Sequence, residues 1–337
     1  MNRVLSGMRP TGRLHLGHYH GVLTNWVQLQ HEHPCLFMVA DWHALTTAYD
    51  EPGAIGQHTQ DMIIDWLAAG IDPSKATLFI QSRVPEHAEL FLLLSMMTPL
   101  SWLERVPTWK DQQEKLLHKD LATYGFLGYP LLQAADILIY RADKVPVGED
   151  QVPHIEFTRE IARRFNHLYG RPVLAEPKAL LTHASKMPGL DGQKMSKSYG
   201  NTIALREEAD VITKKMRTMK TDPARMRRTD VGDPEKCPVW QFHKIYSSDE
   251  VKTWVEAGCR SAGIGCLDCK QPMIEAVLKE QAPMRERAKA FEADPARITA
   301  IIDEGCEKAR RLAQDTLREV RNAIGLTRMV TKPTPVT

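Results

Sequence analysis

The sequence lacks a long hydrophobic run, an excess of either charge, and an N-terminal leader. Its longest apolar stretch, around Leu90–Met97, is far shorter than the roughly 18 residues of a membrane-spanning helix, so no membrane association is expected. Its 44 basic and 42 acidic residues leave a net charge of +2, which means that any surface for a polyanion must be local. Without an apolar or Arg/Ser-rich leader, the protein is expected in the cytoplasm.

Cysteine is also sparse, with six residues in 337, and disulfides are not expected in a cytoplasmic protein of this length. Apolar residues make up 43% and charged residues 26% of the chain. This composition is typical of a folded globular protein and excludes an intrinsically disordered one. The length allows two domains.

Short apolar runs alternate with helical patterns through the first half of the chain. Apolar strands that alternate with helices form βαβ units, which predicts an α/β fold with a parallel, Rossmann-like sheet. The expected strands are Val4–Met8, Cys35–Ala40, Thr77–Gln81 and Lys144–Val147, and the expected helices are Leu16–Gln30, Ile55–Ala69, Tyr129–Tyr140 and Val152–Phe165.

This alternation is broken twice. Residues 83–128 contain helical and polar segments, as an insertion into the sheet domain would, and strand patterns disappear after about residue 200. We therefore expect a Rossmann-like catalytic domain at 1–200 with a helical insertion at about 83–128. An all-helical domain is expected at 201–328, followed by a flexible tail at 329–337.

The first candidate motif, R-P-T-G-R-L-H-L-G-H, spans residues 9–18 between the first strand and the first helix. Gly17 and His18 should lie in the first helical turn, where free backbone N–H groups and the helix dipole favour an anion. Gly17 would let a flat purine approach the backbone, and His15 and His18 can donate hydrogen bonds to phosphate oxygens. Gly-His is common at helix starts, so this motif alone leaves nucleotide binding open.

The second candidate motif, K-M-S-K-S, spans Lys194–Ser198 and lies between Gly192 and Gly200. Two lysines with a hydroxyl between them can hold a polyphosphate and follow its charge into a transition state. An ordinary solvated basic loop is the alternative for such a lysine pair.

Together, HLGH and KMSKS resemble the paired signatures of class I aminoacyl-tRNA synthetases, with HLGH in place of the family's HIGH. The resemblance implies that the protein uses ATP with Mg²⁺. It also implies that His18, Lys194 and Lys197 act in catalysis while an amino-acid carboxylate displaces pyrophosphate. The residues implied to contact ATP are Arg9, Pro10, Thr11, Gly17, His18, Gly148, Glu149, Asp150, Met187, Lys194, Met195, Ser196, Lys197 and Ser198.

Asp136 falls on the apolar stripe of the predicted helix LLQAADILIY. A buried carboxylate costs several kcal/mol unless it is paired or hydrogen-bonded. With Tyr129 and Gln133 on the same helix face, it would suit a flat ring that carries one N–H or O–H donor, such as indole or phenol. A core aspartate that caps a neighbouring loop is the alternative.

The segments AADILIY, VPVGEDQ and HIEFTREIARRFN closely resemble bacterial tryptophanyl-tRNA synthetases, with tyrosyl enzymes as the alternative. The resemblance implies that Asp136 accepts the indole N–H of L-tryptophan. The other residues implied at the substrate are Tyr129, His43, Gln151 and Gln133, the last at a position where many relatives have methionine. Phenylalanine would leave the carboxylate unpaired, so no editing domain is expected.

The same resemblance implies transfer of the amino acid to the 3′ end of tRNA(Trp) by a homodimer, with the helical domain at 201–328 binding the anticodon. Basic residues in the C-terminal half are candidate contacts to tRNA phosphates: Arg206, Lys214, Lys215, Arg217, Lys220, Arg225, Arg227, Arg228, Lys308, Arg310, Arg311, Arg318 and Arg321. Small nucleotidylyltransferases share the T-x-G-H pattern but lack a downstream KMSKS and a helical domain of this size. A synthetase paralogue that became an RNA-binding regulator should have lost one of the two signatures.

Four cysteines, Cys237, Cys259, Cys266 and Cys269, have the spacing C-x₂₁-C-x₆-C-x₂-C. Zinc sites favour paired C-x₂-C units, and only one is present. The irregular spacing suits an iron–sulfur cluster held by thiolates. It is also similar to the [4Fe–4S] motif of some bacterial tryptophanyl enzymes, with zinc or four unrelated thiols as alternatives. Cys35 and Cys306 are predicted to be core thiols.

Overall fold

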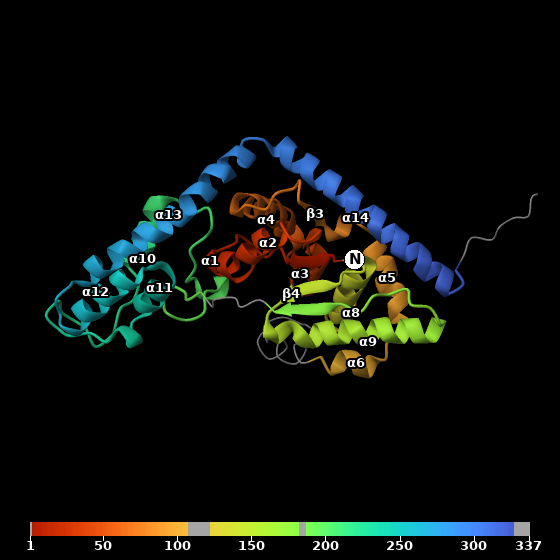
Figure 1. The fold of residues 1–337 in the computed structure, drawn as a ribbon, viewed down its shortest axis with the longest axis horizontal. Helices are drawn as coiled ribbons and strands as arrows, with labels where there is room; N and C mark the ends of the chain where they lie inside the picture. Colours follow the sequence, from red (N-terminus) through yellow and green to blue (C-terminus); the bar gives the residue numbers. More distant parts are fainter. Residues whose placement is uncertain (1, 107–121, 182–186, 327–337) are drawn as a thin grey trace, which may run out of the picture.

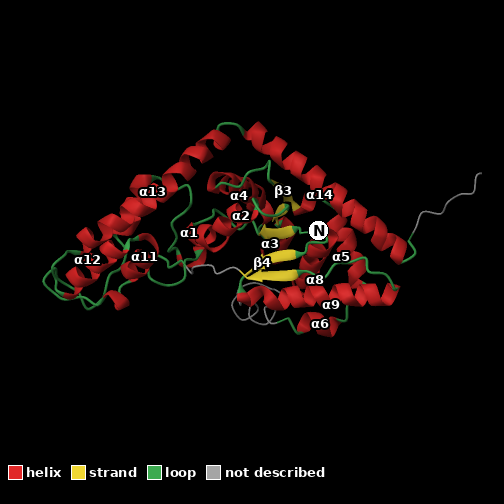
Figure 2. Cartoon of the chain, in the orientation of Figure 1, coloured by secondary structure: helices red, strands yellow, loops and turns green. Residues whose placement is uncertain are grey.

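The computed structural model describes residues 2–106, 122–181 and 187–326. Five strands form one parallel sheet in the order β3-β2-β1-β4-β5 (Figures 1 and 2). They are β1 (Val4–Met8), β2 (Cys35–Val39), β3 (Ala76–Ile80), β4 (Lys144–Val147) and β5 (Lys178–Leu181). The predicted α/β class is confirmed. The strand order reverses between β1 and β4, and ligands of open parallel sheets bind at the carboxyl ends of strands at such a point.

Helices and short connecting turns surround the sheet. They are α1 (Leu16–His18), α2 (Thr24–Leu29), α3 (Asp41–Ala48), α4 (Ile55–Ala69), α5 (Glu86–Ser95), α6 (Leu100–Glu104), α8 (Tyr124–Ile139) and α9 (Val152–Tyr169). The predicted helix Leu16–Gln30 is interrupted by a π-helical turn at Tyr19–Leu23. Such turns widen a helix locally and are frequent near functional sites.

The core lies between these helices and the sheet. All five residues of β2 are buried, as expected for an inner strand of a parallel sheet. Trp26 of α2 stacks on Phe37 of β2 with ring centroids 4.2 Å apart, and Trp66 of α4 meets the same indole edge-on. Cys35 and Cys306 are buried, as predicted.

The predicted helical insertion begins with α5 and α6, but residues 107–121 within it lie outside the described part of the chain, as does the predicted tail at 329–337. None of the helices within the described ranges combines the length and apolar character needed to cross a membrane.

After residue 200 the described elements are helical, as predicted: α10 (Ala209–Arg217), α11 (Pro238–Tyr246), α12 (Asp249–Arg260), α13 (Cys266–Glu292) and α14 (Pro295–Ala323). In Figure 1, α13 and α14 meet as an inverted V, with α10–α12 at the outer end of α13. Helix α14 runs back along the sheet. The helical part is therefore not one separate lobe.

A glycine allows α14 to touch the sheet backbone directly. A Cβ on Gly305 would lie 1.8 Å from the carbonyl oxygen of Leu78 in β3, a separation that no real side chain has. A backbone hydrogen bond from Ile80 also reaches the thiol of Cys306. The last helix is thus seated against strand β3.

Candidate active site

A cavity of about 400 Å³ lies at the carboxyl ends of β1 and β4, where the strand order reverses. This volume is in the range of small-molecule sites. Seven residues predicted from sequence to contact ATP or the amino acid line it: Arg9, His43, Tyr129, Gln133, Asp136, Gly148 and Gln151. His154 of α9 also lines the cavity and was not predicted.

Asp136 of α8 is 2% exposed and accepts hydrogen bonds at both carboxylate oxygens. His43 Nε2 lies 2.7 Å from Oδ2, and His87 Nδ1 lies 2.6 Å from Oδ1. Gln81 Nε2 lies 2.9 Å from Oδ1 and 3.0 Å from Oδ2. Burial tends to raise the pKa of Asp136, but these hydrogen bonds hold it below its ordinary value. The group is therefore an anion at neutral pH.

Sequence reasoning missed Gln81 and His87. Gln81 follows β3 and His87 lies in α5, 55 and 49 residues before Asp136. The sheet order and the position of α5 bring them to the carboxylate, and no local periodicity indicates such a contact.

The HLGH motif has fixed histidine tautomers. His15 caps α1, with its Nδ1 accepting from the Gly17 N–H at 3.1 Å, and His18 Nδ1 accepts from the His15 N–H at 3.2 Å. Burial lowers the pKa of His15 to about 4, and burial with nearby cations lowers that of His18 to about 3. Both rings are neutral at pH 7, so each carries its proton on Nε2 and can donate from there.

The KMSKS motif lies beside HLGH. Lys197 Nζ donates to the carbonyl of Thr11 at 3.2 Å, and a Cβ on Gly17 would lie 3.6 Å from Met195 Cβ. Burial lowers the pKa of Lys197, and Asp65 opposes that shift. Met195 is buried and anchors the loop, while Lys194 and Ser198 are exposed. The two motifs therefore form one surface.

A buried asparagine outside both motifs holds the KMSKS loop. Asn201 Oδ1 accepts from the Ser196 N–H at 2.8 Å, and its Nδ2 donates to Asp191 at 2.7 Å and to the Lys194 carbonyl at 3.2 Å. The sequence motif gave no indication of this role.

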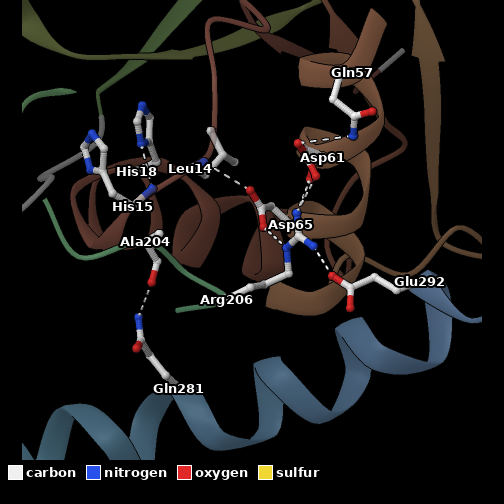
Figure 3. Close-up of polar contacts among 10 residues, drawn as sticks. All are labelled: Leu14, His15, His18, Gln57, Asp61, Asp65, Ala204, Arg206, Gln281 and Glu292. Atoms are coloured by element: carbon white, nitrogen blue, oxygen red, sulfur yellow. Dashed lines mark hydrogen bonds and ion pairs between the residues drawn. The ribbon is translucent and has the colours of Figure 1, made fainter. Parts of the chain in front are cut away.

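An ion-pair network behind HLGH links it to the C-terminal helices (Figure 3). Asp65 of α4 accepts from the Leu14 N–H at 3.1 Å and from Arg206 Nε at 2.6 Å. Arg206 also pairs with Asp61 at 3.0 Å and with Glu292 of α13. Gln281 of α13 donates to the Ala204 carbonyl at 3.0 Å. We call Asp61, Asp65, Arg206 and Glu292 the Arg206 network.

The remaining predicted ATP contacts differ in exposure. Glu149 and Asp150 are exposed in a short turn after β4, Thr11 is exposed and Pro10 is buried. Met187 is buried, and its carbonyl accepts from the Met195 N–H at 3.1 Å.

The prediction that Arg206 and Arg225 contact tRNA phosphates is wrong. Arg206 is enclosed in its network, and Arg225 is buried with its guanidinium on the carbonyls of Arg228 and Ile264. Both guanidinium groups are therefore paired within the protein. On α14, Arg310 and Arg321 pair with Glu86 and Glu89 of α5. Exposed basic residues remain at Lys214, Arg217, Lys220, Arg227 and Arg228.

The four clustered cysteines come from three places: Cys237 before α11, Cys259 near the end of α12, and Cys266 and Cys269 in the first turn of α13. All are free thiols. Burial raises the pKa of Cys269 to about 12, and the nearby Cys237, Cys259 and Cys266 add to that shift. Within the described ranges, however, no three histidine, cysteine or acidic side chains are arranged as metal ligands. The structure thus brings the thiols near one another without assembling a metal site.

Comparisons with known proteins agree with this geometry. The family model for tRNA synthetases class I (W and Y) matches residues 1–280. The chain is 58% identical to the tryptophan–tRNA ligase of Ralstonia nicotianae, over 96% of this chain and 98% of that protein. It is 53% identical to the Thermotoga maritima ligase, over 96% and 99%.

Solved structures also resemble this chain over nearly its full length. The tryptophanyl-tRNA synthetase of Campylobacter jejuni, in complex with ADP and tryptophan, has a TM-score of 0.86 and 32% identity, and the match covers 96% of this chain and 99% of that one. The predicted family is confirmed: the chain belongs to the class I tRNA synthetases of the tryptophan and tyrosine family.

Proposed function

We propose that this protein is a tryptophan–tRNA ligase, which activates L-tryptophan with ATP and transfers it to tRNA(Trp). The observation that carries this proposal is the anionic Asp136 on the wall of the cavity at the carboxyl ends of β1 and β4, which Arg9 of the first motif also lines. Identity of 58% to a tryptophan–tRNA ligase over nearly the whole chain supports it. ATP enters as its Mg²⁺ complex.

In the activation step, a carboxylate oxygen of tryptophan attacks the α-phosphorus of ATP, and the bond to pyrophosphate breaks. Negative charge moves toward the leaving pyrophosphate. The neutral His15 and His18 can donate Nε2–H hydrogen bonds to phosphate oxygens without a proton leaving the protein. Lys194 and Lys197 supply positive charge where the new negative charge develops, which lowers the barrier most.

In the amino-acid site, Asp136 accepts a hydrogen bond from the indole N–H, and Gln133 contacts the ring. The α-amino and carboxylate groups of tryptophan are held by Tyr129, His43 and Gln151. All five side chains line the same cavity, which supports this assignment. Arg9, Thr11, Gly17, Gly148, Glu149, Asp150 and the loop residues Met195, Ser196 and Ser198 would surround ATP. Pro10 would only shape the turn, and Met187 would act through its backbone.

Pyrophosphate exchange with each of the twenty amino acids tests the activity, followed by charging of tRNA(Trp) and tRNA(Tyr) transcripts. Exchange only with tryptophan and charging only of tRNA(Trp) is expected. Preferential exchange with tyrosine would replace the proposal with a tyrosyl enzyme. Absence of exchange with all twenty would favour an RNA-binding paralogue.

We also propose that the four cysteines hold a [4Fe–4S] cluster, with zinc as the alternative. Two buried cations beside the thiols support an anionic group there. Arg225 Nη1 lies 3.8 Å from Cys259 Sγ. Burial lowers the pKa of Lys270, and the nearby Cys266, Cys237 and Cys269 partly oppose this shift. Four thiolate donors suit the cluster, which would fix the start of α13.

Purification without oxygen tests this site through iron, sulfide and zinc per chain together with the visible spectrum. A Cys266→Ser/Cys269→Ser variant is the comparison, and Cys35→Ser is the matched control. Four irons and four sulfides in wild type, lost in the double variant, are expected. One zinc per chain without sulfide would show that the cysteines hold zinc and not a cluster. An active protein without metal would refute the proposed metal site.

We further propose that residues 1–200 form the catalytic domain and that residues 201–328 form the anticodon-binding domain, in a cytoplasmic homodimer. The exposed side chains of Lys214, Arg217, Lys220, Arg227 and Arg228 support a phosphate-binding surface on the helical part. Charge-reversal of Lys220 and Arg227 should weaken tRNA binding and reduce its salt dependence, while pyrophosphate exchange stays unchanged. Sedimentation measures the oligomeric state.

A further inference from the structure

A buried chain of polar groups continues from Asp136 away from the cavity. His87 Nε2 lies 2.7 Å from the Tyr140 hydroxyl, and its Nδ1 lies 2.6 Å from Asp136 Oδ1. Both His87 and Tyr140 are 0% exposed, and neither lines the cavity. Two helices contribute: His87 belongs to α5, Asp136 belongs to α8, and Tyr140 is the C-cap residue of α8.

The protons in this chain can be assigned from its donors and acceptors. An ionised carboxylate only accepts, so His87 donates from Nδ1. A neutral His87 then accepts at Nε2, and Tyr140 donates its hydroxyl proton there. Burial and the neighbouring carboxylates raise the pKa of Tyr140 well above its ordinary value, so this proton stays in place. The tyrosine therefore reinforces the histidine tautomer that donates to Asp136.

The two oxygens of Asp136 face different surroundings. Oδ1 is bonded by His87, which lies outside the cavity, whereas Oδ2 is bonded by the cavity-lining His43. Gln81 Nε2 spans both oxygens, and its Oε1 has no partner among the described residues, as expected where a carboxylate attracts the amide nitrogen. Because His43 lines the cavity and His87 does not, a ring N–H that enters the cavity is expected to meet Oδ2.

We propose that His87, set by Tyr140, is a positioning residue that fixes the Asp136 carboxylate so that Oδ2 accepts the ring N–H of the substrate. This inference rests on the proposed function. His87 lies outside the cavity and does not contact the substrate. It acts by fixing the plane of the Asp136 carboxylate, so that Oδ1 stays on His87 and Oδ2 stays available to the ring N–H. Selectivity for a ring N–H thus depends on a histidine outside the cavity.

The test compares tryptophan with β-(1-benzothiophen-3-yl)alanine, in which sulfur replaces the ring N–H at nearly the same size. The measured quantity is the ratio of kcat/KM values for the two substrates in pyrophosphate exchange. His87→Leu removes the bond to Asp136 and should lower the ratio about 10- to 100-fold, as expected for a charged hydrogen bond. His87→Asn keeps a donor near the Nδ1 position and should restore part of it.

Tyr140→Phe keeps the aromatic ring but removes the hydroxyl that bonds to His87 Nε2, so the histidine is held less firmly and the ratio should fall severalfold. This variant tests the inference if His87→Leu does not fold. Tyr246→Phe is the matched control, because Tyr246 bonds to His20 and Glu280 away from the cavity and should change both substrates alike. Equal losses on both substrates in the His87 and Tyr140 variants would overturn the inference. A wild-type enzyme without preference for tryptophan would instead overturn the proposed function.

Discussion

The Arg206 network makes a strong prediction about stability and catalysis together. Arg206→Met removes the guanidinium that pairs with Asp61, Asp65 and Glu292 while keeping much of the side-chain volume. Asp65 is 1% exposed, and it then keeps only its bond from the Leu14 N–H. Because Leu14 precedes His15, the loss reaches the ATP motif directly (Figure 3).

The magnitude follows from burial. Removing one partner of a buried ion pair costs about 3–5 kcal/mol, because the other charge is left without compensation. Asp65 can relieve part of this by taking up a proton, since burial raises its pKa. We therefore expect a loss of about 3 kcal/mol at pH 8. A smaller loss is expected at pH 5, where the carboxyl is more readily protonated in the folded state.

Urea denaturation at both pH values, with pyrophosphate exchange on the same samples, measures these effects. Asp65→Asn in the Arg206→Met background keeps an acceptor for Leu14 but removes the buried charge, so the double variant should be more stable than the single one. Arg311→Met is the matched control, because Arg311 pairs with Glu307 one turn away on the exposed face of α14. Such exposed pairs contribute at most about 1 kcal/mol to stability. A single variant as stable as the control would refute the reasoning.

Three further predictions concern the active site. Lys197→Ala should lower kcat for adenylate formation far more than it raises KM for tryptophan, since its charge acts mainly in the transition state; stopped-flow measurement showing only weaker ATP binding would contradict this. Asp136→Ala should reduce kcat/KM for tryptophan by about 1.5–3 kcal/mol, and wild-type exchange in that variant would show that the assigned pocket is wrong. Because the folded-state pKa of His18 is about 3 against an ordinary 6.5, the unfolded chain binds the extra proton. Stability should therefore fall as the pH drops from about 6.5 toward 3, and His18→Gln should weaken that dependence in urea titrations.

The parallel sheet was largely predictable because its inner strands are mostly apolar, and Cys35–Val39 is apolar throughout. Strand β5 was not, since Lys178–Leu181 is an edge strand of only four residues with both ends exposed. Helix α3 was missed because its eight residues carry only a weak amphipathic pattern between β2 and a turn.

For the candidate site, the ATP loops could be predicted from two short motifs, and the grouping of Asp136 with Tyr129 and Gln133 from one helix face. The contacts of this carboxylate with Gln81 and His87 could not be predicted, because they depend on the strand order and on helix packing. The same limit applies to charge. Arg206 and Arg225 have the sequence context of surface residues, and only the tertiary structure reveals the buried acceptors around them.

The contact of Gly305 with Leu78 has a consequence for the synthesis of the chain. Strand β3 is the outermost strand on its side of the sheet, and an uncovered edge offers its N–H and C=O groups to strands of other molecules. Helix α14 covers that edge, but it follows all five described strands in the chain and leaves the ribosome after them. Until then a nascent chain presents an open template for aggregation, so a protein truncated before α14 should precipitate even though its sheet is complete.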